Sequence, residues 1–167
     1  CAFDADDVIR HRKILIVNLA TGTRADYTTE ILGTFVVNKL VAAAYRQGAI
    51  ADREKRVRHF FFVDEFQNFM HKASGWDRSL SELRKFKLCL VLVTQFVEQV
   101  KEEIRAAIFG NVGFLVAFRV GHRDSKILKD EFEGSSKQDL LELQRGECLV
   151  RVGTHAMSVR TDLPPEP

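Results

Sequence analysis

The sequence is poor in the features that mark several common classes of protein. Its three cysteines form no CxxC pair and its five histidines stand at unrelated spacings, so neither a disulfide framework nor a metal-ligand pattern is expected. This cysteine usage favours a reducing compartment, which we take to be the cytoplasm. No apolar run approaches the roughly 20 residues that a membrane helix needs, and no signal peptide is present. Any membrane association would therefore require segments outside this chain.

The sequence also lacks the phosphate-binding loop of many nucleotide-hydrolysing proteins. No glycine is followed by lysine, so the Walker A pattern GxxxxGK[ST] is absent. Without the backbone amides and the lysine of that loop, this chain alone is expected to bind a nucleotide poorly or not at all. Either the loop precedes this chain in a longer protein, or the chain is a degenerate relative that hydrolyses nothing. The start at Cys1 rather than methionine favours the first explanation.

The chain does contain enough apolar material for one globular core. It has 167 residues, of which 46% are hydrophobic, and we expect a single domain over residues 1–167. The formal net charge of +2 names no acidic partner. All three prolines fall within the last four residues, and the segment 163–167 is typical of a chain leaving a domain.

Short apolar runs alternate with segments of helical periodicity. Continuous apolar runs of this length predict strands buried on both faces. Their alternation with helices predicts the α/β fold class, with a mostly parallel sheet flanked by helices. Two last strands, joined at Gly153 and Thr154, predict a C-terminal antiparallel hairpin. The predicted strands are residues 13–19, 60–63, 88–93, 111–118, 148–152 and 156–160, and the helical patterns lie within 26–48, 76–86, 97–109, 124–132 and 137–143.

Two adjacent carboxylates, Asp64 and Glu65, directly follow one apolar run. Acids at the carboxyl end of a buried strand are costly unless something uses them, and that edge of an open α/β sheet is where ligands bind. In a nucleotide site Asp64 would hold Mg²⁺, directly or through water. Glu65 would orient or deprotonate the water that attacks the γ-phosphate of ATP. An equally good alternative is that the pair only opens a helix, with Asp64 as its cap.

Polar residues also stand at or near the ends of other predicted strands, namely Gln95, Arg119 and Asn18. Parallel strands would bring them to one crevice with the two acids. There Gln95 could hydrogen-bond the γ-phosphate or the attacking water, and Arg119 could balance phosphate charge. The simpler alternatives are that Gln95 caps the next helix, that Arg119 pairs with Asp124, and that Asn18 is a turn residue.

Arg84 is expected at the opposite edge of the sheet, because it lies near the C-terminal end of the helix that precedes the strand 88–93. It could not easily reach the crevice of its own subunit, but it could reach that of a neighbour in a ring. This geometry fits an arginine finger supplied in trans. A solvated arginine at a helix end is an equally good interpretation.

Six stretches, taken in order along nearly the whole chain, together carry a family resemblance although no single one is specific. They are Lys13-Ile-Leu-Ile-Val-Asn-Leu19 with Gly22, Phe62-Val-Asp-Glu-Phe-Gln-Asn-Phe69, Leu83-Arg-Lys-Phe-Lys-Leu88, Val93-Thr-Gln95, Phe109-Gly-Asn-Val-Gly113 and Phe118-Arg-Val-Gly121. The closing Thr161-Asp-Leu-Pro-Pro165 is similar to the end of the same domain. The chain resembles the C-terminal half of the motor domain of hexameric P-loop ATPases of the HerA/FtsK type, and especially TraG/TraD-like coupling proteins of conjugation and type IV secretion.

The resemblance implies a RecA-like core, ATP hydrolysis with Mg²⁺ at subunit interfaces, a homohexameric ring, and DNA moved through its pore. Asp64 and Glu65 match the Walker B pair, and Gln95 matches the motif III glutamine. Arg84, eleven residues before that glutamine, matches the trans arginine finger, and Arg119 matches a recurrent arginine. The missing Walker A half and the missing membrane anchor of many coupling proteins depart from the family pattern.

The function that follows is part of an ATP-driven DNA-translocating motor, with DNA, further copies of the same subunit and proteins of a secretion apparatus as expected partners. This chain alone is expected to be inactive. One alternative is a non-catalytic RecA-like assembly module. Another is a protein-secretion or pilus-assembly ATPase of the same superfamily.

Overall fold

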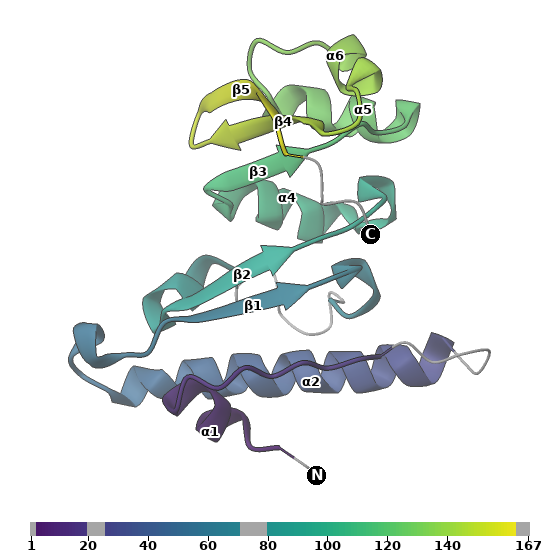
Figure 1. Cartoon of the computed structure of the whole chain (residues 1–167). Coiled ribbons are helices and arrows are strands. Elements are labelled where there is room, and N and C mark those ends of the chain that lie inside the picture. The colour runs from purple at the N-terminus through teal and green to yellow at the C-terminus, as the bar shows by residue number, and fades with distance from the viewer. Residues whose placement is uncertain (1–2, 20–25, 71–79, 163–167) are drawn as a thin grey trace. The chain divides into compact units, whose positions relative to one another are not determined.

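The computed structural model describes residues 3–19, 26–70 and 80–162, and it shows an α/β chain (Figure 1). This confirms the fold class expected from the sequence. The α-helices are α1 (Ala5–Arg10), α2 (Asp26–Arg46), α4 (Glu102–Asn111), α5 (His122–Leu128) and α6 (Lys137–Glu142). The strands are β1 (His59–Val63), β2 (Leu88–Leu92), β3 (Phe114–Ala117), β4 (Glu147–Val152) and β5 (His155–Arg160).

Contacts group the chain into two compact units, Cys1–Gln95 and Phe96–Pro167. The first unit holds α1, α2, β1 and β2, and the second holds the helices and strands from α4 onward. That both units form one domain, as expected from the sequence, stays a prediction.

The first unit is organised around one parallel pair of strands. β1 and β2 lie side by side in register along their whole length, and both coincide with predicted apolar runs. Val63 and Leu88 are buried, whereas Phe60 and Phe62 are 56% and 69% exposed. The expectation that β1 is buried on both faces is therefore wrong. Successive side chains of a strand point to opposite faces, and no described residue covers the face that carries these two rings.

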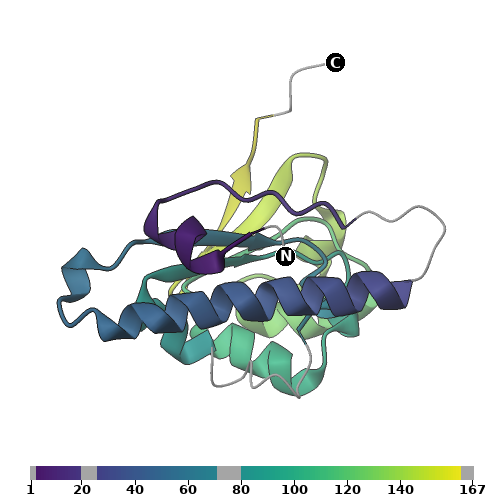
Figure 2. The same ribbon diagram turned by 90° about the horizontal axis from the view of Figure 1, so that it is seen from below.

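The long helix α2 runs along this strand pair and packs against α1 (Figures 1 and 2). Its apolar residues recur at helical spacing, which gives it one buried stripe. Asp6 of α1 accepts two hydrogen bonds from the Arg46 guanidinium, at 2.7 and 2.6 Å, and these hold the pKa of the Asp6 carboxyl below its usual value. Because this ion pair is exposed, burial of the stripe contributes more to stability. The buried residues of α2 include Val37, Leu40, Val41, Ala43 and Ala44.

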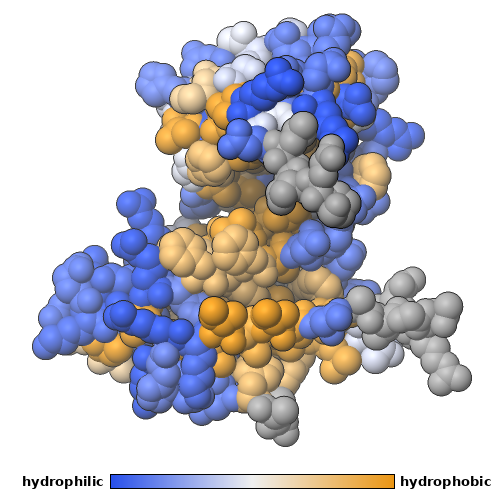
Figure 3. Space-filling model, in the orientation of Figure 1, coloured by the Kyte–Doolittle hydropathy of each residue, from blue (hydrophilic) through white to orange (hydrophobic). Residues whose placement is uncertain are grey.

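The strand predicted over residues 13–19 does not form. The amide of Lys13 donates to the carbonyl of Val8, 2.9 Å away, at the end of α1, and the residues after it join no ladder of the described sheets. Ile14 and Ile16 are 91% and 86% exposed. A strand requires a neighbour that exchanges backbone hydrogen bonds with it, and none of the described strands pairs with this segment. Figure 3 shows the resulting apolar surface over β1, β2 and this segment.

The second unit contains an antiparallel sheet in the order β3–β4–β5. β4 and β5 form the predicted hairpin, with Val152 opposite His155 across a turn in which Gly153 has a φ of +60°. Glycine adopts this left-handed conformation without steric cost. The helical patterns predicted at 97–109, 124–132 and 137–143 are confirmed, with shifted ends. Helices and sheet enclose a core of Ala117, Leu128, Phe132, Leu140, Leu143 and Leu149.

Strand pairing departs from the expected predominance of parallel neighbours, because the described strands make one parallel and two antiparallel pairs. The run 111–118 does form a strand, β3, but its described partner is the antiparallel β4. An apolar run favours a strand but carries no information about the direction of its neighbour.

Part of the predicted helix at 76–86 lies outside the described residues, as does Gly22 of the first family stretch. Residues 80–82 are helical and continue into the 3-10 turn η5 (Leu83–Phe86). Among the described helices none is both long and apolar enough to cross a bilayer.

Close packing of α2 on the segment after β1 can be tested at Gly33, where a β-carbon would lie 2.3 Å from the Phe69 ring. We expect overpacking in Gly33→Ala to lower the free energy of unfolding by about 1–3 kcal/mol. The higher helix propensity of alanine offsets roughly 1 kcal/mol of this loss. Gly110→Ala in α4 is the matched control, because a β-carbon there meets nothing within 4 Å, and it should stabilise. Urea denaturation measures both changes, and a stabilised Gly33→Ala variant would contradict this packing.

Candidate functional site

The carboxyl ends of β1 and β2 lie next to each other. The amide of Val93 donates to the carbonyl of Val63 at 3.0 Å, and the amide of Phe66 donates back to the carbonyl of Val93 at 3.2 Å. The chain therefore leaves both strands at one edge, with Asp64 and Glu65 after β1 and Gln95 just beyond β2. The structure brings these three predicted site residues to the same edge.

The backbone turns sharply at Glu65, which has φ +47° and ψ +47°. This left-handed conformation is uncommon for a residue other than glycine and is held only where its surroundings require it. The Asp64 carboxylate accepts a hydrogen bond from the amide of Glu65 at 3.0 Å, and the Gln67 side chain donates to Glu65 Oε2 at 2.6 Å. Asp64 is exposed and Glu65 is half-buried.

A single 3-10 turn, η3 (Phe66–Asn68), follows the two acids, and neither carboxylate caps it. The alternative that the pair merely opens a helix therefore explains little of what is seen. The turn and the residues after it are anchored by the buried side chains of Phe66, Phe69 and Met70. The Thr34 hydroxyl of α2 donates to the carbonyl of Phe69 at 3.4 Å.

Asn18 is exposed and lies on the segment that forms no strand. Its neighbour Leu19 and the Phe69 ring both lie against Gly33 of α2, so this end of the segment approaches the residues that follow η3. Gln95 is exposed and makes no side-chain hydrogen bond among the described residues. The next turn, η6 (Val97–Gln99), begins after Phe96 and has no side-chain cap, so the capping alternative for Gln95 is not supported.

Arg119 belongs to the second unit, in the loop between β3 and α5, and it is exposed. The alternative that Arg119 pairs with Asp124 is not supported, because Asp124 is 4% exposed and its carboxylate accepts a hydrogen bond from the amide of Glu98 at 2.8 Å. That Arg119 reaches the edge carrying Asp64 stays a prediction.

Arg84 lies in η5, which ends one residue before β2 begins. Gln95 follows the other end of β2. Because β1 and β2 are parallel, Asp64 and Glu65 also lie at that other end, so Arg84 is at the opposite edge of the strand pair, as the sequence predicts. The Arg84 side chain is exposed and has no hydrogen bond or ion pair within the described ranges. It is therefore available to another molecule.

Two polar side chains that the sequence analysis missed hold the backbone beside Arg84. Gln47, which is buried, donates to the carbonyls of Val57 and Phe86 at 3.1 and 2.9 Å. Arg56 donates to the carbonyl of Lys85 at 2.6 Å. These partners lie 10, 39 and 29 residues away in the sequence, so no local pattern could have identified them. Gln67 is the third missed residue, although its position two residues after Glu65 was a usable signal.

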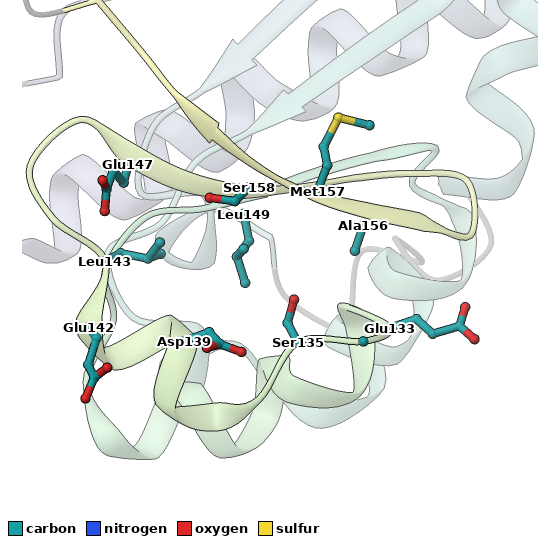
Figure 4. A pocket seen from close by; sticks show the side chains of 11 residues that line it. Glu133, Ser135, Asp139, Glu142, Leu143, Glu147, Leu149, Ala156, Met157 and Ser158 are labelled. Atoms are coloured by element: carbon teal, nitrogen blue, oxygen red, sulfur yellow. The ribbon is translucent and has the colours of Figure 1, made fainter.

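A pocket of about 500 Å³ lies in the second unit, between α6 and the β4–β5 hairpin (Figure 4). Two of its carboxylates make hydrogen bonds within their own segments. Hydrogen bonds from Ser136 hold the pKa of Asp139 below its usual value in a capping box, and Glu147 Oε2 accepts a hydrogen bond from the amide of Gln144 at 2.9 Å. None of the predicted site residues lines this pocket.

Asp64 has the exposure and position to hold a magnesium ion. Mg²⁺ in nucleotide sites keeps several waters and is bound by one or two carboxylates together with the phosphates, so a single exposed aspartate fits. The described residues hold no cluster of three or more His, Cys, Asp or Glu side chains that could bind an ion without the nucleotide. A lysine-containing phosphate loop is not part of this sequence.

Several solved structures share the fold at low sequence identity. B204, the genome packaging NTPase from Sulfolobus turreted icosahedral virus 2, in complex with AMPPCP, has a TM-score of 0.68 at 13% identity over 98% of this chain and 73% of that chain. The bacterial conjugative coupling protein TrwB has a TM-score of 0.63 at 15% identity over 83% of this chain and 39% of that chain. VirB4 of Thermoanaerobacter pseudethanolicus has a TM-score of 0.57 at 17% identity over 81% of this chain and 39% of that chain.

These likenesses confirm the RecA-like fold that the sequence motifs imply. The chain spans 39% of VirB4 and of TrwB, so each of those proteins is more than twice as long as the part matched here. Among curated protein sequences none matches this chain.

Residues 9–133 match the sequence profile of one protein family, the type IV secretion-system coupling protein DNA-binding domain. The matched range covers more than half of the 167 residues and includes every predicted site residue from Asn18 to Arg119. The resemblance seen in the sequence motifs is thereby confirmed. This chain belongs to the family of type IV secretion-system coupling protein DNA-binding domains.

Proposed function

We propose that this chain is part of an ATP-driven motor that moves DNA in conjugation or type IV secretion. The observation that carries the proposal is the adjacency of the two strand ends that present Asp64, Glu65 and Gln95. Family membership supports DNA as the partner. The phosphate-binding loop would come from a part of the protein that this sequence does not include.

In the proposed site Asp64 holds Mg²⁺, which neutralises charge on the phosphates when bound. Glu65 orients a water molecule and accepts its proton. The water oxygen forms a bond to the γ-phosphorus while the bond between that phosphorus and the leaving ADP oxygen breaks. Gln95 hydrogen-bonds the γ-phosphate or the water, and Arg119 and Asn18 contact the nucleotide.

Arg84 would complete the site of the adjacent subunit in a homohexameric ring. Its guanidinium is exposed, has no partner among the described residues and is held on a backbone fixed by Gln47 and Arg56, which supports a role towards a neighbouring copy. A ring of this kind would work in the cytoplasm, attached to a membrane and to secretion-apparatus proteins through other segments.

Two other functions fit the same fold. A non-catalytic RecA-like assembly module would keep the strand-end geometry without hydrolysing ATP, and a protein-secretion or pilus-assembly ATPase would hydrolyse ATP without DNA. Direct observation of a GxxxxGK[ST] loop earlier in the natural protein would favour either ATPase over the assembly module.

Glu65→Gln in the full-length protein should lower ATP turnover by about 100-fold or more while leaving nucleotide affinity near the wild-type value. The amide has nearly the shape of the carboxylate but cannot accept the proton of water. Steady-state turnover and equilibrium binding of a fluorescent ATP analogue measure the two effects. Wild-type turnover in this variant would refute the assignment of Glu65.

DNA should raise the ATP turnover of the full-length protein, because a translocating motor couples hydrolysis to movement along its substrate. Turnover is measured with single-stranded DNA, with duplex DNA and with heparin, a polyanion that controls for charge alone. Equal rates with and without DNA would favour a protein-secretion ATPase instead.

Subunit mixing tests the trans role of Arg84. Arg84→Ala and Glu65→Gln proteins should each be nearly inactive, since an arginine finger contributes roughly 10³–10⁵-fold to turnover. A mixture should recover activity, because some interfaces pair an intact Glu65 with an intact Arg84. If mixed rings form, as shown by native mass spectrometry, and activity stays at the level of either variant alone, Arg84 does not act in trans.

A further inference from the structure

The carboxylate of Glu65 is held by a neighbour on the same turn. Gln67 Nε2 donates a hydrogen bond to Glu65 Oε2 across 2.6 Å. In an α-helix, side chains two residues apart do not face each other. Here the left-handed backbone at Glu65 and the tight η3 turn bring the two side chains together.

Buried neighbours hold the backbone of Gln67 in place. Phe66 and Phe69 on either side of Gln67 are 4% and 9% exposed, and the amide of Phe66 is bonded to Val93 at the end of β2. Neither residue can shift without opening the packing that joins η3 to the two strands. Gln67 therefore transmits a fixed position to the carboxylate that it bonds.

Only one oxygen of Glu65 is engaged in this way. Within the described residues its Oε1 accepts no hydrogen bond, and the side chain is half-exposed. An amide donor suits this task because an ionised carboxylate can only accept hydrogen bonds. The arrangement holds Oε2 and leaves Oε1 without a hydrogen-bond partner among the described residues, so Oε1 can accept a hydrogen bond from a water molecule.

We propose that Gln67 is a positioning residue that holds Glu65 by Oε2 so that Oε1 is presented to the attacking water. This inference rests on the proposed function, since it gives Gln67 a role only if Glu65 acts on water. Loss of the bond would let the glutamate sample several rotamers, few of them productive. Displacement of a reacting group by about 1 Å can cost on the order of 100-fold in rate.

The test compares variants of the full-length protein in ATP turnover. Gln67→Met removes the donor at similar volume, and Gln67→Glu keeps the shape but replaces the donor with a second carboxylate. Both should lower kcat by about ten- to one-hundredfold and leave KM for ATP within about twofold of wild type. The matched control is Asn68→Leu, which removes an exposed amide from the same turn and should keep wild-type kcat and KM. Equal thermal melting temperatures would show that the variants are folded.

A double variant separates positioning from a structural role. Adding Gln67→Met to Glu65→Gln should leave the residual rate unchanged, because no carboxylate remains to be positioned. A further fall in the double variant, or wild-type kcat in both Gln67 variants while Glu65→Gln is inactive, would overturn the positioning role alone. Wild-type kcat in Glu65→Gln itself would instead overturn the assignment of Glu65 in the proposed function.

Discussion

Two backbone hydrogen bonds at the carboxyl end of the β1–β2 pair determine the geometry of the candidate site. Val93 donates to Val63 and accepts from Phe66, so the turn that contains Glu65 is tied to the neighbouring strand on both sides of the bend. Buried backbone groups of this kind must be paired, and their pairing fixes where the chain can leave the sheet. This backbone pairing places Asp64, Glu65 and Gln95 at the same edge of the strand pair. No hydrogen bond between their side chains is needed for that placement.

Much of this arrangement could be predicted because its signals are local. The apolar runs of β1 and β2, the turn at Gly153 and the helical periodicity of α2 each depend on residues close in sequence. The placement of Asp64, Glu65 and Gln95 at one edge required only one further assumption, that the two strands are parallel neighbours. The structure confirms that assumption for this pair.

The remaining features depend on partners that a single sequence does not name. Residues 13–19 have the composition of a strand, but Ile14 and Ile16 stay exposed because composition cannot supply a neighbouring strand. The direction of pairing of β3 was missed for the same reason. Gln47 bonds carbonyls that lie 10 and 39 residues away in the sequence, and Arg56 bonds one that lies 29 residues away. Contacts over such separations can be identified only once the backbone fold is known.

The open apolar face of the first unit has a practical consequence for handling the chain by itself. Ile14, Ile16, Phe60 and Phe62 together offer water a surface that most soluble monomers keep covered. In a cell, chaperones are expected to bind such a surface, and in vitro it promotes aggregation as the protein concentration rises. Expressing the chain together with a segment or partner that covers this face should therefore yield more soluble protein than detergent extraction or refolding.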